Sequence, residues 1–358
     1  MRYALIGCGR ISPNHVMAAK NNGLEIVAVC DIEKANAEDK ILKFDLDARK
    51  VKVYEDYKEL LEKEKPELVA IATESGKHAA IALDCIAAGC HVIIEKPIAL
   101  SIADANAIIA AGKEKGVLVC ANHQNRFNKS IQEIRKAIEK NRFGRLLYGT
   151  AHIRWARNHE YYDRASWRGT WEQDGGALMN QCIHDIDLLR WMMGDEIDTV
   201  MGMTDRLIHP YIEAEDLGLA LVKFKNGSYG TIEGTTNVYP KNLEETLYIF
   251  GEKGTVKAGG EAVNIIEEWK FSDYFGDEEE VKKECSENPP NIYGFGHTKL
   301  YKNVINAIEG KEELLVDGEA GKRALELVLA IYKSAAEGKP VKLPLEECST
   351  MDFVGRFE

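Results

Sequence analysis

Residues 3–12 read Tyr-Ala-Leu-Ile-Gly-Cys-Gly-Arg-Ile-Ser, an apolar run that passes directly into a glycine-rich turn. A helical pattern follows from about Asn14. A strand, a glycine turn and a helix start direct backbone N–H groups and the positive end of a helix dipole at one point, which suits a pyrophosphate. Ser12 replaces the third glycine of a GxGxxG pattern and is small enough for close packing of helix on strand. The residues expected to line a dinucleotide here are Gly7, Gly9, Arg10 and Ile11.

The next apolar strand ends on Asp31, twenty-four residues after Gly7. A carboxylate at this place can accept both hydroxyls of an adenosine ribose and repels a 2′-phosphate. The pattern therefore predicts NAD rather than NADP as the cofactor. The alternative is a glycine turn in some other Rossmann-like protein, in which Asp31 caps the end of the strand.

Strand and helix patterns alternate through the first third of the chain. Strands are expected near 2–7, 25–31, 67–72, 90–95 and 117–121, and helices near 14–22, 33–44, 56–64, 76–88 and 101–115. Five repeats of strand followed by helix are typical of a parallel sheet. The sequence therefore predicts the α/β class, with a doubly wound Rossmann sheet at the N-terminus.

The pattern changes after Asn122. A helix is expected near 128–140, then strands near 145–157, 197–206, 216–224, 228–238, 244–251 and 254–258. Short turns between strands indicate a mostly antiparallel sheet in an α+β domain. We expect an NAD-binding domain at 1–122 and a domain for substrate binding and oligomerisation at 123–358.

The end of the chain predicts one loop and two helices. An acidic run at 277–280 and the pair Pro289-Pro290 flank the expected loop, and amphipathic helices are expected near 297–309 and 319–337. An antiparallel sheet often keeps one face free, and that face can pack on a second copy. A homo-oligomer, either a dimer or a tetramer, is therefore expected.

The second apolar stretch with chemical content is the strand at 90–94, which stops on Glu95-Lys96-Pro97. Ligands bind beyond the carboxyl ends of strands in open α/β sheets, so an ammonium at this place indicates chemistry. The strand at 67–72 leads through Thr73 to His78, which places both near the same edge. His78 is equally well interpreted as a surface residue of the following helix.

The segment Gly175–Asp187 contains a histidine at helical spacing from an asparagine. Asn180 and His184 are four residues apart and share one helix face, away from the inward stripe of Ile183, Ile186 and Leu189. The glycine pair before this helix lets a ligand approach the backbone. A lone histidine on a helix is more often structural than functional, so both interpretations stay open.

Arginine and tryptophan gather between residues 152 and 171. The arginines are at positions 154, 157, 164 and 168, and three of the five tryptophans are at 155, 167 and 171. Guanidinium groups suit phosphate or carboxylate, and flat aromatic faces suit sugars and bases. The alternative is a solvated strand face with snorkelling side chains.

Composition excludes several classes of protein. The net charge of −12 argues against nucleic acid or an anionic membrane as partner. The eight cysteines include no CxxC pair, so we expect buried thiols and no metal site. No apolar run approaches the roughly 20 residues that cross a bilayer, and the first residues are already a nucleotide-binding strand. The cytoplasm is the expected compartment.

The motifs GCGRIS (7–12), IATESGKH (71–78), IIEKP (93–97) and GGALMNQCIHDID (175–187) occur in this order. They resemble the glucose-fructose oxidoreductase and inositol dehydrogenase (Gfo/Idh/MocA) family across nearly the whole chain. The resemblance implies Lys96 as the catalytic lysine and His184 as the catalytic histidine, with Trp167 and Arg168 near the nicotinamide. Many sugar dehydrogenases of the family carry an aspartate where this chain has Asn180, which removes one candidate proton acceptor.

Three further stretches, NHQNRFN (122–128), YYDRASWRGTWEQDGGALMNQ (161–181) and IYGFGH (292–297), resemble the members of this family that oxidise the 3-hydroxyl of UDP-N-acetylated sugars. This implies oxidation of a UDP-N-acetylhexosamine, or of its uronic acid, to a 3-keto sugar for surface polysaccharides. A dehydrogenase of a free sugar or inositol, and a non-catalytic NAD-binding regulator, are the alternatives.

The resemblance also completes the expected site residues. Cofactor contacts are expected from Thr73, His78, Glu95, Lys96, Gln124, Trp167 and Arg168 in addition to the glycine turn and Asp31. Substrate contacts are expected from Lys96, Asn125, Arg126, Arg157, Arg164, Asn180 and His184.

The two candidate catalytic groups differ in basicity. Lysine begins near a pKa of ~10.4 and histidine near ~6.5, so histidine needs the smaller change to accept a proton at neutral pH. We therefore expect His184 to be the general base and Lys96 to stabilise the developing alkoxide. A positive nicotinamide nearby can depress the pKa of Lys96 enough to reverse these roles.

Overall fold

The computed structural model describes residues 1–273, 276–287 and 294–358. The chain forms two compact units. The first contains Met1–Gln124 and Gly296–Lys322, and the second contains Asn125–Phe295 and Arg323–Glu358. Within the described residues, no helix combines the length and the apolar character needed to cross a membrane.

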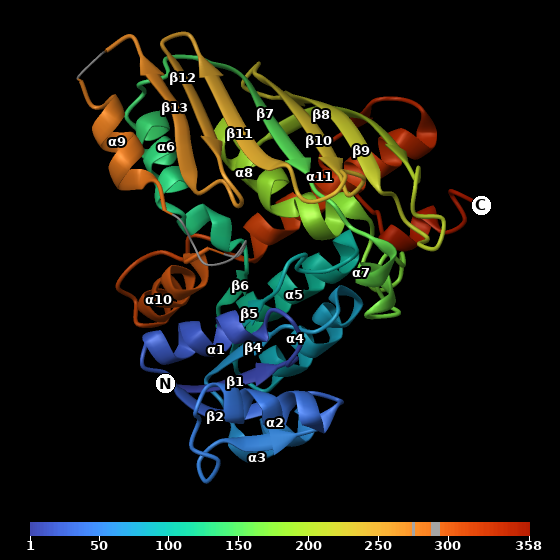
Figure 1. Cartoon of the computed structure of the whole chain (residues 1–358). Helices are drawn as coiled ribbons and strands as arrows, with labels where there is room; N and C mark the ends of the chain where they lie inside the picture. Colours follow the sequence, from blue (N-terminus) through green and yellow to red (C-terminus); the bar gives the residue numbers. More distant parts are fainter. Residues whose placement is uncertain (274–275, 288–293) are drawn as a thin grey trace. The chain divides into compact units, whose positions relative to one another are not determined.

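The first unit is built on a six-stranded parallel sheet of order β3-β2-β1-β4-β5-β6 (Figure 1). The predicted parallel Rossmann sheet is confirmed. The order reverses between β1 and β4, and the crevice at such a switch point is where ligands of this fold bind. The short β3 escaped prediction, because three residues cannot display a period. The strands are β1 (Arg2–Ile6), β2 (Glu25–Cys30), β3 (Lys52–Tyr54), β4 (Leu68–Ile71), β5 (His91–Ile94) and β6 (Val119–Ala121).

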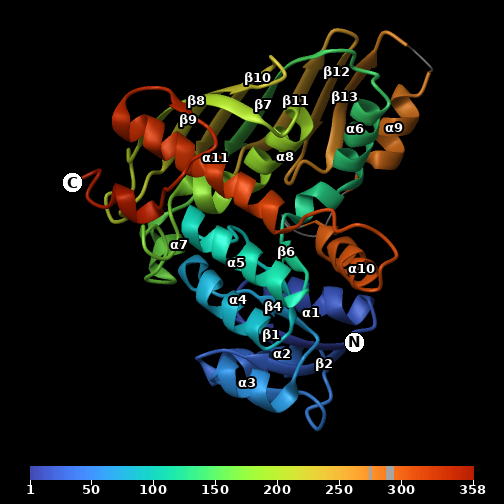
Figure 2. The same ribbon diagram turned by 180° about the vertical axis from the view of Figure 1, so that it is seen from behind.

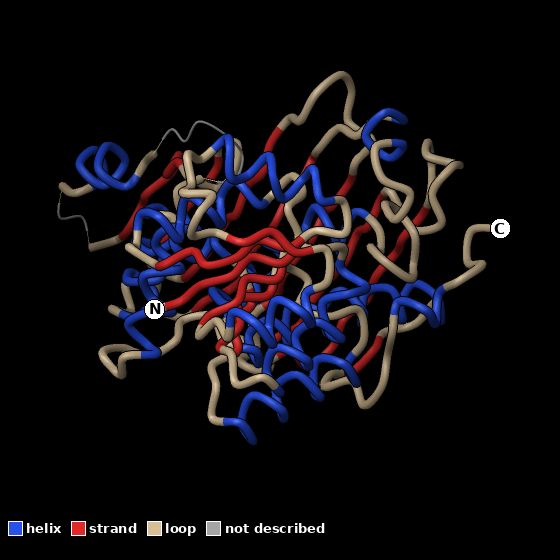
Figure 3. Tube along the Cα trace, turned by 90° about the horizontal axis from the view of Figure 1, so that it is seen from below, coloured by secondary structure: helices blue, strands red, loops and turns tan. Residues whose placement is uncertain are grey.

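Helices cover both faces of this sheet, as Figure 3 shows in blue around the red strands beside the N-terminus. Helix α1 packs on α10, and α4 packs on α5. Because the sheet is buried from both sides, Leu5, Val69 and Ile93 have no exposed surface. The helices are α1 (Ser12–Asn21), α2 (Lys34–Lys43), α3 (Tyr57–Glu64), η1 (Ser75–Lys77), α4 (His78–Ala87), α5 (Ile102–Lys115) and α10 (Gly296–Ile308), and the short η2 (Gln124–Phe127) follows β6.

The second unit contains an eight-stranded sheet of order β13-β12-β11-β7-β10-β9-β8-β14. Among the described strands of this sheet, only β7 and β10 pair in parallel, so the predicted, mostly antiparallel sheet is confirmed. Strands β13 and β14 were not predicted. The strands are β7 (Leu146–Arg154), β8 (Ile197–Asp205), β9 (Leu217–Phe224), β10 (Tyr229–Thr235), β11 (Glu244–Gly251), β12 (Gly254–Gly259), β13 (Ile265–Phe271) and β14 (Val341–Lys342).

Helices α6, α8 and α11 lie on one face of this sheet (Figure 2). Helix α8 comes so close to β7 that a Cβ on Gly149 would lie 2.8 Å from the Leu189 side chain. On the other face, Met203, Leu219 and Leu221 are exposed. The helices are α6 (Lys129–Glu139), α7 (His159–Asp163), the π-helical turn η3 (Leu178–Cys182), α8 (Ile183–Met193), α9 (Glu278–Cys285), α11 (Gly318–Glu337) and η4 (Thr350–Phe353), and the first residues of α11 belong to the other unit.

The loop predicted after the acidic run 277–280 is wrong in part, because α9 begins there. Glu278, Glu279 and Glu280 form its first turn and Lys282 and Lys283 its last, so the charges complement the helix dipole. Lys282 also pairs with Glu278 at 2.9 Å. Acidic residues therefore mark the beginning of a helix here. The Pro289-Pro290 part of that prediction lies outside the described residues.

Candidate active site

The glycine turn after β1 has one position fixed by packing and one that is open. Gly7 has φ +92°, and a Cβ there would lie 2.5 Å from the backbone of Ala72. Gly9 has no neighbouring atom within 4 Å of such a Cβ. The Ser12 hydroxyl donates to the Gly9 carbonyl oxygen at 2.6 Å, and the side chain is buried at the first turn of α1. The open space beside Gly9 at this helix N-terminus fits a pyrophosphate.

Asp31 caps the end of β2 and remains able to bind a ribose. Its carboxylate accepts the backbone N–H of Cys8 at 2.8 Å and of Glu33 at 2.9 Å, and the Asn36 amide at 3.2 Å. The capping role considered as an alternative is therefore present. Three donors leave acceptor capacity on two carboxylate oxygens, so capping does not prevent a ribose contact. The next residue, Ile32, is 80 % exposed.

His78 links the loops that follow β4 and β5. Its Nδ1 lies 2.7 Å from the Pro97 carbonyl oxygen and its Nε2 lies 3.2 Å from that of Thr73. The side chain is only 1 % exposed, so its interpretation as a surface residue is wrong. Burial lowers the pKa of His78, although both carbonyl contacts act in the opposite direction. The imidazole thus holds two segments of the strand edge together.

Lys96 follows the carboxyl end of β5 and is half-buried. Its backbone N–H donates to Oε2 of the buried Glu95 carboxylate at 3.2 Å. Gln124 is buried after β6. The carboxyl ends of parallel strands meet at one edge of a sheet, so the residues predicted to bind cofactor in this unit share that edge. They are Gly7, Gly9, Arg10, Ile11, Asp31, Thr73, His78, Glu95, Lys96 and Gln124.

In the second unit, His184 is the half-buried member of an otherwise buried stretch. Ile183, Asp185 and Ile186 have no exposed surface. The predicted α-helical face shared by Asn180 and His184 is interrupted, because Leu178–Cys182 form a π-helical turn and regular α8 begins at Ile183. Such turns are frequent at functional sites. The sequence carries no signal that separates this turn from an α-helix.

A buried glutamate supports the start of this helix. Glu215 accepts the Leu178 N–H at 2.8 Å and the Tyr332 hydroxyl at 2.9 Å. A Cβ on Gly176 would collide with its carboxylate, so Gly176 leaves room for an acid rather than for a ligand. Burial raises the pKa of Glu215 to about 8, against the opposing effect of these hydrogen bonds. Glu215 therefore stays protonated through neutral pH.

Two more buried carboxyl groups interact with each other, and one of them, Asp185, follows His184 in the chain. Asp185 and Glu245 are both buried and interact by a side-chain hydrogen bond. Burial raises the pKa of Asp185 to about 7 and raises that of Glu245 well above its ordinary value. The Asn125 amide donates to Glu245 at 3.4 Å. The two carboxyl groups therefore share a proton near neutral pH, an arrangement that sequence reasoning missed.

Arg157 and Arg168 surround one aromatic ring. Their guanidinium carbons lie 4.8 and 4.3 Å from the Tyr161 ring centroid, and Arg168 also lies 5.5 Å from that of Trp167. The Gln181 amide donates to the Tyr161 hydroxyl at 3.1 Å. The structure thus brings the predicted arginine-rich segment against the segment that contains Asn180 and His184.

The other predicted arginines have protein partners. Arg126 is buried and forms a bidentate pair with Asp187 at 2.7 and 2.6 Å. Arg164 is exposed and pairs with Glu160 at 2.6 Å. Arg154 pairs across the sheet with Glu233 and Glu244, as expected from a strand face. Contacts of Arg126 and Arg164 with substrate stay predictions.

Two family models match the chain. The one described as "Oxidoreductase family, NAD-binding Rossmann fold" matches residues 1–123, and the one described as "Oxidoreductase family, C-terminal alpha/beta domain" matches residues 135–343. Among curated proteins, the myo-inositol 2-dehydrogenase of Thermotoga maritima is 27% identical, over 96% of this chain and 98% of its own.

Two solved structures are more similar in sequence to this chain than the myo-inositol 2-dehydrogenase is. The WlbA dehydrogenase of Bordetella pertussis, in complex with NADH and UDP-GlcNAcA, is 40% identical with a TM-score of 0.90, over 97% of this chain and 98% of its own. The WlbA dehydrogenase of Chromobacterium violaceum, in complex with the same two molecules, is 38% identical with a TM-score of 0.88, over 97% and 96%.

Proposed function

The chain belongs to the Gfo/Idh/MocA oxidoreductase family and is an NAD-dependent enzyme that acts on CH–OH groups, and on this premise we propose a specific reaction. It is the oxidation of C3 of a UDP-N-acetylhexosamine uronic acid to the 3-keto sugar, the activity of a UDP-N-acetyl-2-amino-2-deoxyglucuronate dehydrogenase. The observation that carries this proposal is the similarity, at 40% and 38% identity, to two dehydrogenases bound to NADH and UDP-GlcNAcA. The product would feed the synthesis of aminated surface sugars.

The residues of the first unit fit NAD. The open space at Gly9 receives the pyrophosphate, and the remaining acceptor capacity of Asp31 receives the ribose hydroxyls. When bound, NAD supplies the acceptor for a hydride. We assign the other contacts with the cofactor to the edge residues Thr73, His78, Glu95, Lys96 and Gln124, and to Trp167 and Arg168 of the second unit.

The protein's own side chains remove the proton of the reacting hydroxyl and stabilise the negative charge that this leaves on its oxygen. His184 accepts the hydroxyl proton as the C–H bond breaks, because an imidazole is a base near neutral pH. The Lys96 ammonium donates to the oxygen and stabilises the negative charge that develops there. Asn180 is neutral and orients the sugar instead of accepting a proton.

The nucleotide and the sugar carboxylate need cationic partners. Arg157 and Arg168 present guanidinium groups around Tyr161, and both suit a diphosphate or carboxylate. Lys129, which pairs with Glu287 at 3.2 Å, is a further candidate at the protein surface. Asn125, Arg126, Arg164 and Asn180 complete the proposed substrate contacts.

A second candidate is oxidation of a free polyol. It is favoured by the 27% identity to a myo-inositol 2-dehydrogenase over nearly the full length. The two candidates differ in one requirement, because a polyol dehydrogenase gains nothing from a uridine diphosphate group.

The oligomeric state and the cellular compartment are also part of the proposal. The exposed apolar residues Met203, Leu219, Leu221 and Tyr229 lie on strands β8, β9 and β10 and suit a second copy of the chain. We therefore propose a homo-oligomer. We place it in the cytoplasm, where NAD and UDP-sugars are available.

The proposal is tested by mixing the purified protein with NAD and, separately, with UDP-GlcNAcA, UDP-GlcNAc and myo-inositol, and by following the NADH absorbance. UDP-GlcNAcA is expected to give the highest kcat/KM. Equal or better oxidation of myo-inositol contradicts the proposed substrate.

Single-turnover rates of three variants test the proposed roles. His184→Asn is expected to slow hydride transfer by at least about 100-fold, the size of a lost general base. Lys96→Met is expected to slow it similarly. His159→Asn is the matched control, because His159 is exposed and pairs with Asp163 on the surface. A full rate in His184→Asn excludes histidine as the base.

A further inference from the structure

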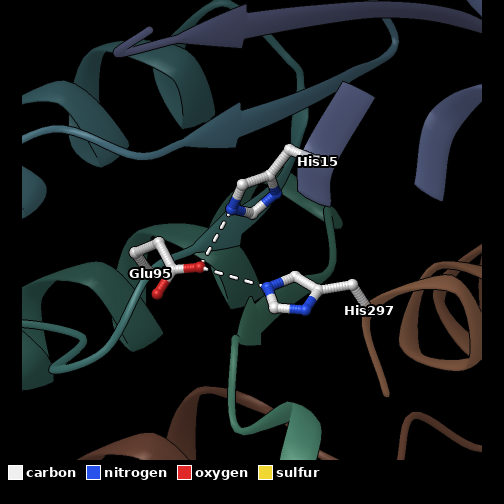
Figure 4. A group of neighbouring side chains, drawn as sticks. All are labelled: His15, Glu95 and His297. Atoms are coloured by element: carbon white, nitrogen blue, oxygen red, sulfur yellow. Dashed lines mark hydrogen bonds and ion pairs between the residues drawn. The ribbon is translucent and has the colours of Figure 1, made fainter. Parts of the chain in front are cut away.

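Glu95, the residue before Lys96, lies in a buried cluster with two histidines from distant parts of the chain (Figure 4). Nε2 of His15 on α1 is 2.9 Å from Oε1 of Glu95, and Nε2 of His297 on α10 is 3.7 Å from the same oxygen. The three side chains are between 0 and 8 % exposed. Three polar groups therefore converge in the interior on the residue that precedes the predicted catalytic lysine.

The surrounding hydrogen bonds define where the protons lie. The Tyr301 hydroxyl is 2.7 Å from Nδ1 of His15, and the Tyr3 hydroxyl is 2.9 Å from that of Tyr301. A phenol donates to an unprotonated imidazole nitrogen, which leaves the Nε2–H of His15 to donate to Glu95. In this arrangement Glu95 is the acceptor of the hydrogen bond from His15.

The Glu95 carboxylate is held at both oxygens. Oε1 accepts from His15 and from the Asn122 amide, whose nitrogen also lies 3.1 Å from Nε2 of His297. Oε2 accepts the backbone N–H of Lys96 at 3.2 Å. Burial alone raises the pKa of Glu95, but the interactions with His15 and His297 outweigh it and hold the pKa well below its ordinary value.

A His-Glu-His group is also a donor set that suits a divalent cation. The position of Asn122 argues for hydrogen bonding instead. Its amide nitrogen bridges Glu95 and His297, and an amide N–H donates hydrogen bonds but does not ligate metals. The cluster is therefore a hydrogen-bonded clamp on a carboxylate.

We propose that Glu95 is a positioning residue for Lys96, which fixes its backbone and keeps its side chain charged. This rests on the proposed function, and it assigns Lys96 to stabilisation of the alkoxide and proton removal to His184. A buried anion next to a lysine favours the ammonium form over the neutral amine. Titratable groups interact with Glu95 from α1, α10 and α4, and they are His15, His297, Tyr301 and His78. From its own strand end, Glu95 receives the backbone N–H of Lys96.

Two of the histidines that interact with Glu95, His78 and His297, are neutral near pH 7, so they bring no positive charge to it. Burial lowers the pKa of His78 and of His297, so both are neutral at and above neutral pH. Lys96 is then the cationic residue next to Glu95 in the chain, and both residues interact electrostatically with His78. Neutralising Glu95 removes the anion but leaves these imidazoles in place.

Glu95→Gln tests the proposal, because it keeps the side-chain volume and one acceptor while removing the charge. The pH midpoint of Lys96 acylation is measured by competitive labelling with acetic anhydride and mass spectrometry of the Lys96 peptide. The midpoint is expected to fall by about one pH unit relative to wild type. Single-turnover oxidation of UDP-GlcNAcA is expected to slow at least about tenfold.

His91→Gln is the matched control at the opposite end of the same strand. His91 accepts the Leu118 N–H at 2.9 Å, so its replacement disturbs β5 without touching the Glu95 end. It is expected to lower the melting temperature while the Lys96 midpoint stays unchanged. Should Glu95→Gln fail to fold, the wild-type midpoint decides, because the proposal requires a value at or above the ordinary ~10.4.

Three results overturn the proposal. They are an unchanged Lys96 midpoint in Glu95→Gln, a wild-type midpoint near 7, and a stoichiometric divalent metal that is lost in His297→Gln. Failure of the proposed function is distinguishable. A wild-type protein that oxidises none of the sugars, but whose Lys96 midpoint shifts in Glu95→Gln, retains the coupling of Glu95 to Lys96 and lacks the proposed activity.

Discussion

The side-chain amide of Asn180 donates a hydrogen bond to Oδ1 of Asp174. Asp174 is buried, and its other carboxylate oxygen accepts the Gly169 N–H at 2.7 Å. A carboxylate therefore lies beside Asn180. In this chain that position is neutral, and its amide orientation is set by the neighbouring acid.

Asn180→Asp is expected to make folding stability depend more strongly on pH. Two adjacent carboxyl groups cannot both ionise without repulsion, so one keeps its proton in the folded state at a raised pKa. A raised folded pKa means that stability falls as pH rises above the unfolded value of ~3.9. Relative to wild type, the variant is expected to lose about 1–3 kcal/mol more at pH 8 than at pH 5, measured by urea unfolding. Asn21→Asp at an exposed site is the control, and equal pH dependence in both variants contradicts the prediction.

Gly7→Ala and Gly9→Ala are expected to fail in different ways. A Cβ on Gly7 collides with the Ala72 backbone at 2.5 Å and φ is positive, so folding stability falls by about 2–4 kcal/mol. A Cβ on Gly9 meets no protein atom, so stability stays within about 1 kcal/mol of wild type. NAD affinity is nevertheless expected to fall at least about tenfold in Gly9→Ala, because the methyl group takes space needed by the pyrophosphate. Unfolding curves measure the stability of each variant, and NADH fluorescence titration measures its affinity for the cofactor. Unchanged NADH binding by Gly9→Ala contradicts the proposed binding of the pyrophosphate at this turn.

Glu215→Gln is expected to stabilise the protein at alkaline pH. The pKa of Glu215 is about 8 in the folded protein against an ordinary 4.5, so its contribution is full below 4.5 and is lost as pH rises towards and beyond 8. Glutamine resembles the protonated acid and does not titrate. The variant is expected to match wild type near pH 5 and to exceed it by about 2–4 kcal/mol at pH 9, measured by urea unfolding. Glu213→Gln, at an exposed neighbour, is the control. A constant difference across this pH range would show that Glu215 does not titrate as described.

Asp187→Asn is expected to destabilise the second unit strongly. The change removes the charge that Arg126 faces in the interior, and breaking a buried pair typically costs about 3–5 kcal/mol. Glu160→Gln removes the partner of the exposed Arg164 and is expected to change stability by less than about 1 kcal/mol. Chemical denaturation of both variants measures the contrast. Similar losses in the two would mean that burial does not govern the strength of these pairs.

The first sheet was predictable because its strands are buried on both faces. Each gives a short continuous apolar run, and the expected strand at 25–31 is observed at Glu25–Cys30. The carboxyl ends of these runs also located Lys96 and Asp31 at one edge. The glycine turn added the helix start, which the structure places at Ser12 instead of Asn14.

Strand β13 gave no such signal. Its residues begin with two adjacent isoleucines, Ile265 and Ile266, and continue with two adjacent glutamates, Glu267 and Glu268. The register shift opposite this strand, between Lys257 and Ala258, breaks the alternation of inward and outward side chains. A period of two is therefore absent where the strand lies.

Contacts over long sequence separations were beyond prediction for a different reason. His15, Glu95 and His297 each follow ordinary local patterns, and nothing in their own segments indicates the others. The π-helical turn before α8 also has no signal in the sequence, because its composition is that of a buried α-helix. Only the packing of complete elements brings such groups together.

The return of Gly296–Lys322 to the first unit has a consequence for synthesis on the ribosome. The segment that begins the chain emerges first, yet Tyr3 and Glu95 acquire Tyr301 and His297 only after some three hundred codons have been translated. Until then the nascent nucleotide-binding half carries an interior acid with only one of its two imidazole partners, His15, and its maturation must wait for nearly the whole polypeptide.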